Sequence, residues 1–175
     1  LFNHAGSVDL VVDVQGWFAT GADYSALVPS RVLDTREGLG ASRARVGAGG
    51  SVDLLVSGVG GVPVSGVGAV VLNVTATGAT EGGYLTVFPA GSSRPLASNV
   101  NFVAGESVPN TVIAKVGAGG KVSVYNSVGA THVVVDVQGW FAETSSSYTP
   151  LVPVRILDTR DGGVAFGAGS VIDVV

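Results

Sequence analysis

Much of the fold follows from one stretch, Val134-Val135-Asp136-Val137-Gln138-Gly139-Trp140-Phe141-Ala142. Its start is rich in valine, a β-branched residue that favours strands. The same nine letters return at residues 11–19, about 120 residues earlier in the chain. Internal repetition of this kind is typical of an array of similar units. The chain therefore contains two copies of one strand-like segment.

A second block repeats with nearly the same spacing. Leu27-Val28-Pro29-Ser30-Arg31-Val32-Leu33-Asp34-Thr35-Arg36-Glu37-Gly38 corresponds to residues 151–162. Short polar stretches separate the copies, as linkers usually do. A period near 120 residues is too long for a solenoid and suits a string of separate domains. We expect the end of a preceding repeat over 1–19, one complete β repeat over 24–142 and the start of a following repeat over 148–175.

Short β-branched runs recur about every 10 residues in the central unit, which is the spacing of a sandwich or barrel. Clusters of Gly and Pro separate the runs, and the 27 Gly and 7 Pro would interrupt any helix. We predict an all-β fold, an antiparallel sandwich or a barrel-like domain of about 120 residues. The expected strands are Ser51 to Val56, Ala69 to Thr77, Tyr84 to Phe88, Ser98 to Val103, Thr111 to Val116, Lys121 to Asn126 and Thr131 to Val137.

Two of these strands are apolar on both faces. Val70-Val71-Leu72 and Val133-Val134-Val135 lack the alternation of apolar and polar residues expected of a strand with one face in water. A neighbouring repeat, a loop or another chain would have to cover the second face. Because only 13% of residues are charged, against about 25% in an average soluble protein, burial between units is favoured.

Composition excludes several classes of function. The net charge of −4, with 9 Lys and Arg, provides no basic stripe for nucleic acid. No apolar run approaches the roughly 18 residues that a membrane-spanning helix needs, so we expect no membrane insertion. With no Cys there is no disulfide, thiol nucleophile or cysteine metal site. We predict no cofactor and no metal.

The central unit resembles a repeat domain of large secreted and cell-surface proteins from actinobacteria and related bacteria. The resemblance rests on the Leu-Val-Pro-Ser-Arg-Val-Leu-Asp-Thr-Arg-Glu-Gly block, on Leu72–Thr75, on Tyr84–Gly91, on Ser98–Phe102 and on the closing Val-Asp-Val-Gln-Gly-Trp-Phe. It implies an extracellular or cell-surface location and a non-catalytic module. It transfers no ligand and no active site.

A polar cluster recurs in both copies of the second block. Asp136 lies in an apolar strand, where we expect it to be substantially buried and paired with Arg31 or Arg36. A structural ion-pair role is favoured over binding of a sugar or an anion. The candidate ion-pair residues are Asp13, Arg31, Asp34, Arg36, Asp136, Arg155, Asp158 and Arg160.

Aromatic residues gather at each predicted junction between units. They could stack on a sugar ring, or they could close one unit against the next, as large aromatic side chains often do. Their position at every junction favours the second interpretation, in which Trp140 and Phe141 are held against the Tyr148 to Pro153 segment. The candidates are Trp17, Phe18, Tyr24, Trp140, Phe141 and Tyr148.

Three hypotheses for function remain. The first is a structural or assembly module of a surface stalk, coat or filament, with neighbouring repeats or other copies of the chain as partners. The second is a carbohydrate-binding or adhesive sandwich, whose partner is a polysaccharide and whose groove is lined by Ser98-Asn99-Val100-Asn101. The third, a hydrolase, lacks an acyl-transfer motif. We predict that the chain is not an enzyme.

Overall fold

The computed structural model of the chain describes residue 18 and residues 23–144, 147–160 and 167–174. The strands of this described part run from Tyr24 to Ala142. They are β1 (Tyr24–Asp34), β2 (Val46–Gly47), β3 (Ser51–Leu55), β4 (Val67–Thr77), β5 (Gly83–Pro89), β6 (Val100–Phe102), β7 (Val108–Lys115), β8 (Lys121–Asn126) and β9 (Ala130–Ala142), with a single 3-10 turn, η1 (Ala118–Gly120), before β8.

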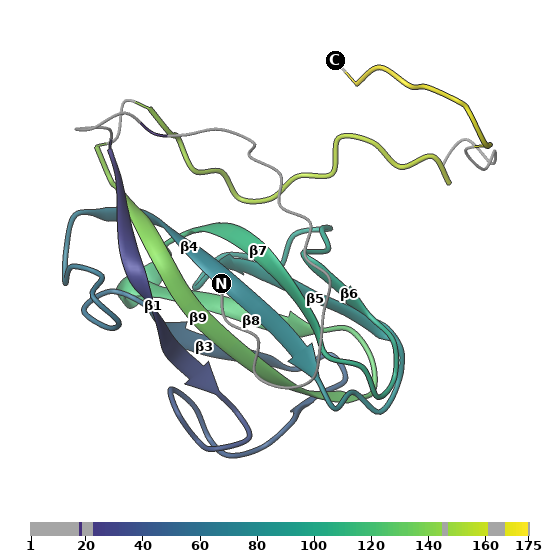
Figure 1. The fold of residues 1–175 in the computed structure, drawn as a ribbon, viewed down its shortest axis with the longest axis horizontal. Helices are drawn as coiled ribbons and strands as arrows, with labels where there is room; N and C mark the ends of the chain where they lie inside the picture. The colour runs from purple at the N-terminus through teal and green to yellow at the C-terminus, as the bar shows by residue number, and fades with distance from the viewer. Residues whose placement is uncertain (1–17, 19–22, 145–146, 161–166, 175) are drawn as a thin grey trace, which may run out of the picture.

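Two antiparallel sheets pack against each other (Figure 1). One has the order β1-β9-β4-β7, with β2 also paired to β9, and the other has the order β3-β8-β5-β6. The sheets do not close into a barrel. The predicted all-β fold is therefore confirmed as an antiparallel sandwich.

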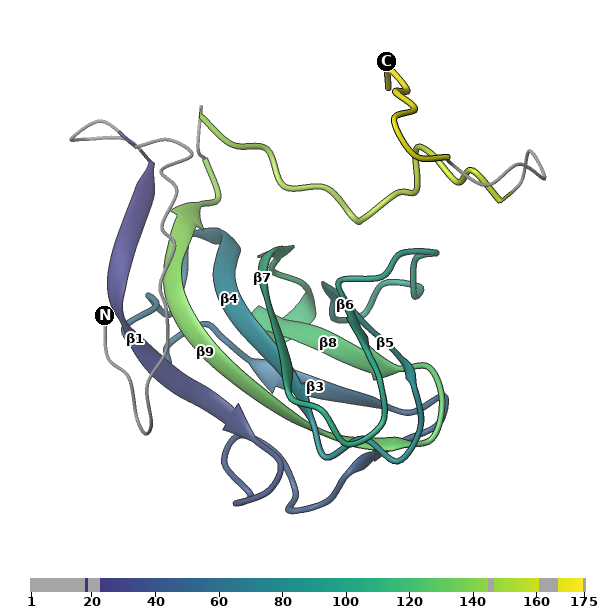
Figure 2. The same cartoon turned by 45° about the vertical axis from the view of Figure 1, so that its right-hand side comes forward.

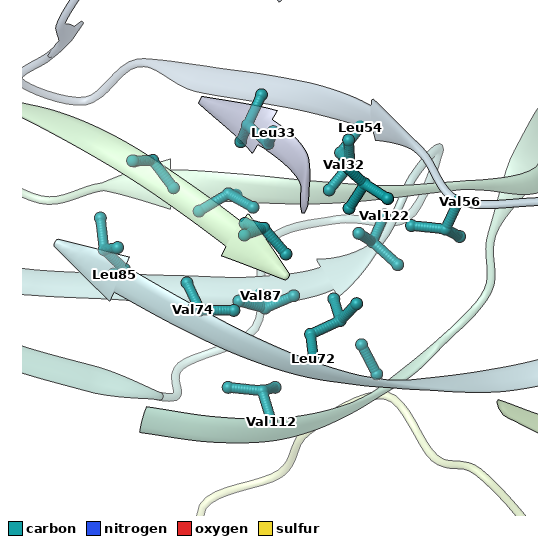
Figure 3. Packing of buried hydrophobic residues seen from close by; sticks show 14 of the residues in the cluster. Val32, Leu33, Leu54, Val56, Leu72, Val74, Leu85, Val87, Val112 and Val122 are labelled. Atoms are coloured by element: carbon teal, nitrogen blue, oxygen red, sulfur yellow. The ribbon is translucent and has the colours of Figure 1, made fainter. Parts of the chain in front are cut away.

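The core between the sheets consists mainly of valine and leucine. Val70, Leu72 and Val74 of β4 are completely buried, because alternate residues of a strand point to the same face. Val122 and Val124 of β8 are completely buried in the same cluster. Figure 3 shows side chains from both sheets filling the space between them. Each such side chain contributes roughly 1.5–3 kcal/mol relative to an exposed one, so this layer is the main source of stability.

The opposite face of β4 is also covered near the start of the strand. Ala69 and Val71 form a second buried cluster with Phe141 of β9. Tyr24 and Tyr148 pack against this cluster. The apolar residues expected on both faces of β4 are thus buried on both, and one of the covering side chains comes from the block that follows the unit.

The first and last strands of the unit are neighbours. β1 and β9 pair antiparallel, from Tyr24 opposite Phe141 at one end to Asp34 opposite Val134 at the other. The backbone N–H of Ala142 donates to the carbonyl oxygen of Asp23 at 3.4 Å. The chain therefore enters and leaves the unit at the same end of the sandwich, as Figure 2 shows for β1 and β9.

Candidate functional site

The repeated Asp-Thr-Arg block forms a tight corner at the end of β1. The carboxylate of Asp34 accepts the backbone N–H of Arg36 at 3.0 Å. The guanidinium of Arg36 folds back and donates to both carboxylate oxygens, from Nε at 2.9 Å and from Nη2 at 2.6 Å. Arg31 adds a bond from Nη1 at 3.4 Å. Asp34 is only 3% exposed, and these four donors satisfy it.

Arg36 is the main reason that Asp34 stays ionised. Its hydrogen bonds to the carboxylate lower the pKa of Asp34 to about 2, against the opposing effect of burial. Backbone and charge interactions with Arg36, and the charge of Arg31, act in the same direction. The same contacts raise the pKa of Arg36. The corner is a closed set of ion pairs whose charges compensate one another.

Asp136 joins this corner from the neighbouring strand. Arg31 donates to it from Nε at 2.9 Å and from Nη2 at 3.3 Å, so Arg31 and not Arg36 is its partner. The side chain of Asp136 is 22% exposed, so Asp136 is largely buried but less deeply than Asp34. Val135 and Val137 face the core, and the alternation of the strand therefore turns Asp136 to the outer face. Asp34 is the deeply buried acid.

The hydroxyl of Thr35 fixes the other side of the corner. Its oxygen accepts the backbone N–H of Val133 at 3.0 Å and lies 3.0 Å from Nδ1 of His132. Burial, followed by the charges of Arg45 and Arg36, lowers the pKa of His132. The Nδ1 atom of a neutral imidazole can accept a hydrogen bond from the Thr35 hydroxyl group. Sequence reasoning missed this contact, because Thr35 and His132 are far apart in the chain.

Glycines complete the turn after the corner. The carbonyl oxygen of Asp34 accepts the backbone N–H groups of Glu37, Gly38 and Leu39. Gly40 has φ +70°, and a Cβ built there would lie 2.2 Å from the carbonyl oxygen of Val32. Only glycine fits such a close approach without a shift of the backbone.

The second copy of the block forms the same internal bonds without joining a sheet. Arg155 donates to Asp158 at 2.8 Å, and Arg160 donates to Asp158 from its backbone N–H and its guanidinium. The hydrogen bonds from Arg160 hold the pKa of Asp158 well below its ordinary value. Residues 148–160 are not part of any strand. The corner therefore forms from contacts within the block itself. Pairing of the block with the last strand of a unit is not required for it.

Four aromatic rings meet at the end of the unit. Phe141 is 2% exposed, and its ring centroid lies 5.0 Å from that of Tyr24 and 4.5 Å from that of Tyr148. Phe18 stacks on Tyr24 at 4.8 Å and remains 56% exposed. Burial raises the pKa of Tyr148. We call Phe18, Tyr24, Phe141 and Tyr148 the junction cluster.

Trp140 does not belong to the junction cluster, which corrects the prediction for it. Trp140 lies opposite Val70 and packs against the main core of its own unit. Phe141 is the next residue along β9, and it therefore faces the other way. Gly139 makes room for the junction cluster, because a Cβ there would lie 2.3 Å from the hydroxyl oxygen of Tyr24.

Two of the predicted site residues, Asp13 and Trp17, lie outside the described residues. The predicted groove at residues 98–101 is used for internal bonds. Asn99 accepts the backbone N–H of Val87 at 2.8 Å, and Ser98 bonds Asn101 at 2.7 Å. These polar groups fasten the loop before β6.

The outer face of the second sheet carries an aromatic pair that the sequence did not indicate. Tyr84 of β5 and Tyr125 of β8 have ring centroids 6.4 Å apart. The guanidinium of Arg94 lies over the ring of Tyr125, 4.4 Å from its centroid. Their separation in the chain hid this pair, and only the strand register brings them together.

Two hollows near the Asp34 corner contain little chemistry. One of about 480 Å³ is lined by Thr35, Arg45 and Asp53 among small residues, with no aromatic side chain. Another of about 330 Å³ opens between β1 and β3, beside Arg31 and Leu54. Among the described residues, no cluster of His, Asp and Glu could hold a metal ion. In the same part of the chain, no helix is long and apolar enough to cross a membrane.

Comparison with known proteins does not assign a family or a function to the chain. No protein-family model matches the chain, and no curated protein matches it.

Proposed function

We propose that this chain is a non-catalytic extracellular repeat module with a structural or assembly role, as part of a surface stalk, coat or filament. The observation that carries the proposal is the position of Phe141, which contacts Tyr24 of its own unit and Tyr148 of the following block. Such a contact across a linker limits the motion of one unit relative to the next.

The polar residues that repeat support the same role. Asp34, Thr35 and Arg36 are all engaged in hydrogen bonds within the unit. A group used in this way is not available to a ligand without the loss of those bonds. The linker is also fastened, because Ser147 donates to the carboxylate of Asp23 from its backbone N–H and its hydroxyl at 3.1 Å.

Carbohydrate binding is the second candidate, and Tyr84 with Tyr125 is the observation that favours it. Two tyrosine rings on the outer face of a sheet provide apolar surface with polar tips, which suits a sugar chain. Arg94 already occupies one face of Tyr125. A glycan would have to displace Arg94 or use Tyr84.

The test uses the full chain with Tyr148→Ala, and Tyr84→Ala as the matched control. Tyr148 lies outside β1–β9, so its loss should leave the strands of the unit folded, as checked by circular dichroism. We expect faster amide hydrogen exchange and faster proteolysis at residues 143–147 in Tyr148→Ala only. We also expect no retention of any variant on insoluble cell-wall polysaccharide.

Two outcomes would contradict the proposal. The first is an unchanged rate of exchange and proteolysis at residues 143–147 in Tyr148→Ala. The second is retention of the wild-type chain on polysaccharide. Loss of that retention in Tyr148→Ala would make the junction cluster a ligand platform, and loss in Tyr84→Ala would place the ligand on the second sheet.

A further inference from the structure

The block after the unit has the sequence of a first strand but lies outside both sheets. Two of its apolar residues are exposed where their counterparts in β1 are buried. Ile156 is 78% exposed and Leu157 is 43% exposed, whereas the corresponding Val32 and Leu33 are 7% and 0% exposed. An extended apolar segment with this exposure lacks the sheet that its sequence fits.

We infer that the β9 edge now occupied by β1 is a binding site for residues 148–160, which can replace β1 there. The occupant is the block of the same chain, because the linker at 143–147 is short enough for it to turn back along β9 as a hairpin. β1 already runs in the required direction, since Tyr24 lies opposite Phe141 and the strand proceeds towards Val134. Tyr148 is in contact with Phe141 at the start of that path.

The contacts of β1 can be reproduced by the block. In the sequence alignment of the two copies, Arg155 corresponds to Arg31, the residue that donates to Asp136. Ile156 and Leu157 correspond to the core residues Val32 and Leu33. The Arg155–Asp158–Arg160 bonds are already formed and match those at Asp34. The block therefore needs no rearrangement of its corner before it pairs.

One difference between the block and β1 tests whether the block fits the edge of β9. The block has Pro150 at the position of Ala26. Proline has no backbone N–H, so it is tolerated only where that group does not bond the neighbouring strand. Asp23 accepts a bond from Ala142, and bonded pairs alternate along an antiparallel ladder. Ala26 thus lies at a position whose N–H points away from β9. Pro150 is compatible with the edge.

Exchange of this kind would let neighbouring units share first strands. Once the block has replaced β1 on β9, β1 is released. Because β1 has the same sequence features as the block, it could pair in the same way with the last strand of the preceding repeat. The exchange concerns strand pairing alone, and it stands or falls separately from the proposed role in a surface assembly.

Engineered cysteines test the exchange cleanly, because the chain has no Cys. Asp136→Cys is combined with Arg155→Cys for the exchanged pair and with Arg31→Cys for the observed pair. Directly opposite residues have Cβ atoms close enough for a disulfide. Asp136→Cys with Ile156→Cys is the register control, because a neighbouring residue points to the other face.

We expect the exchanged pair to form an intramolecular disulfide about tenfold faster than the register control under mild oxidation, as followed by mass spectrometry. Leu33→Ala or the milder Tyr24→Ala, each checked for folding by circular dichroism, should increase the yield of the exchanged pair and reduce that of the observed pair. A yield equal to the register control in every folded background overturns the inference. Disulfides formed only between two chains overturn it as well.

Discussion

The buried carboxylate of Asp34 supplies a stabilisation that can be measured. Asp34→Asn keeps an oxygen that can accept the backbone N–H of Arg36 but removes the negative charge from the guanidinium of that residue. The substitution therefore mimics protonation of Asp34. Since the pKa falls from 3.8 to about 2, the ionised form contributes about 2 kcal/mol to the free energy of unfolding.

Urea unfolding at pH 7, followed by circular dichroism, measures the loss. A decrease of about 2 kcal/mol corresponds to a midpoint lower by about 1 M. Asp136→Asn is the matched control. Its side chain is 22% exposed and its partner Arg31 is 45% exposed, so an exposed pair of this kind contributes below about 1 kcal/mol.

The dependence of stability on pH provides a second measurement. Because the pKa of folded Asp34 is lowered, its contribution is complete above about pH 4 and is lost as the pH falls towards 2. In Asp34→Asn this part of the acid dependence should disappear. Equal destabilisation by Asp34→Asn and Asp136→Asn, with an unchanged acid dependence, would refute the assignment of Asp34 as the central acid.

Two further predictions concern the same corner. Gly40→Ala should lower the free energy of unfolding by more than about 2 kcal/mol, because the new Cβ meets the carbonyl oxygen of Val32. Gly49→Ala, with a similar φ of +69° and open space around it, should cost only about 1 kcal/mol, and equal losses in thermal melts would contradict the steric argument. His132 should titrate by NMR below the ordinary histidine pKa, and a value at or above 6.5 would show that burial does not govern it.

The sandwich was predictable because its strands carry local patterns. The β-branched run at Lys121 to Asn126 forms β8 with the expected bounds. β9 was predicted to end near Val137 but continues to Ala142. Gly139 interrupts the apolar pattern, yet the strand persists because Tyr24 covers that glycine. A contact from a distant strand decided the boundary.

The candidate site was predicted in part, for a similar reason. The sequence indicated Asp136 and Arg31 as a pair but did not show that Asp34 is the more deeply buried acid. The burial of Asp34 depends on the turn that follows it and on Thr35 bonding across to Val133. The separation of Trp140 from Phe141 follows from strand alternation, but only because β9 continues past Val137, which the sequence did not indicate.

The adjacent entry and exit points of the unit have a mechanical consequence. Tension along an array built from this unit pulls on Asp23 and Ala142 at the same end of one strand pair. The bonds between β1 and β9 then carry the load one after another, as in a zipper, and do not resist together in shear. Full extension of one unit would release at most about 430 Å of chain, at about 3.3–3.6 Å per residue. The junction cluster sits where that opening must begin, so its four rings are the first resistance that a stretching force meets.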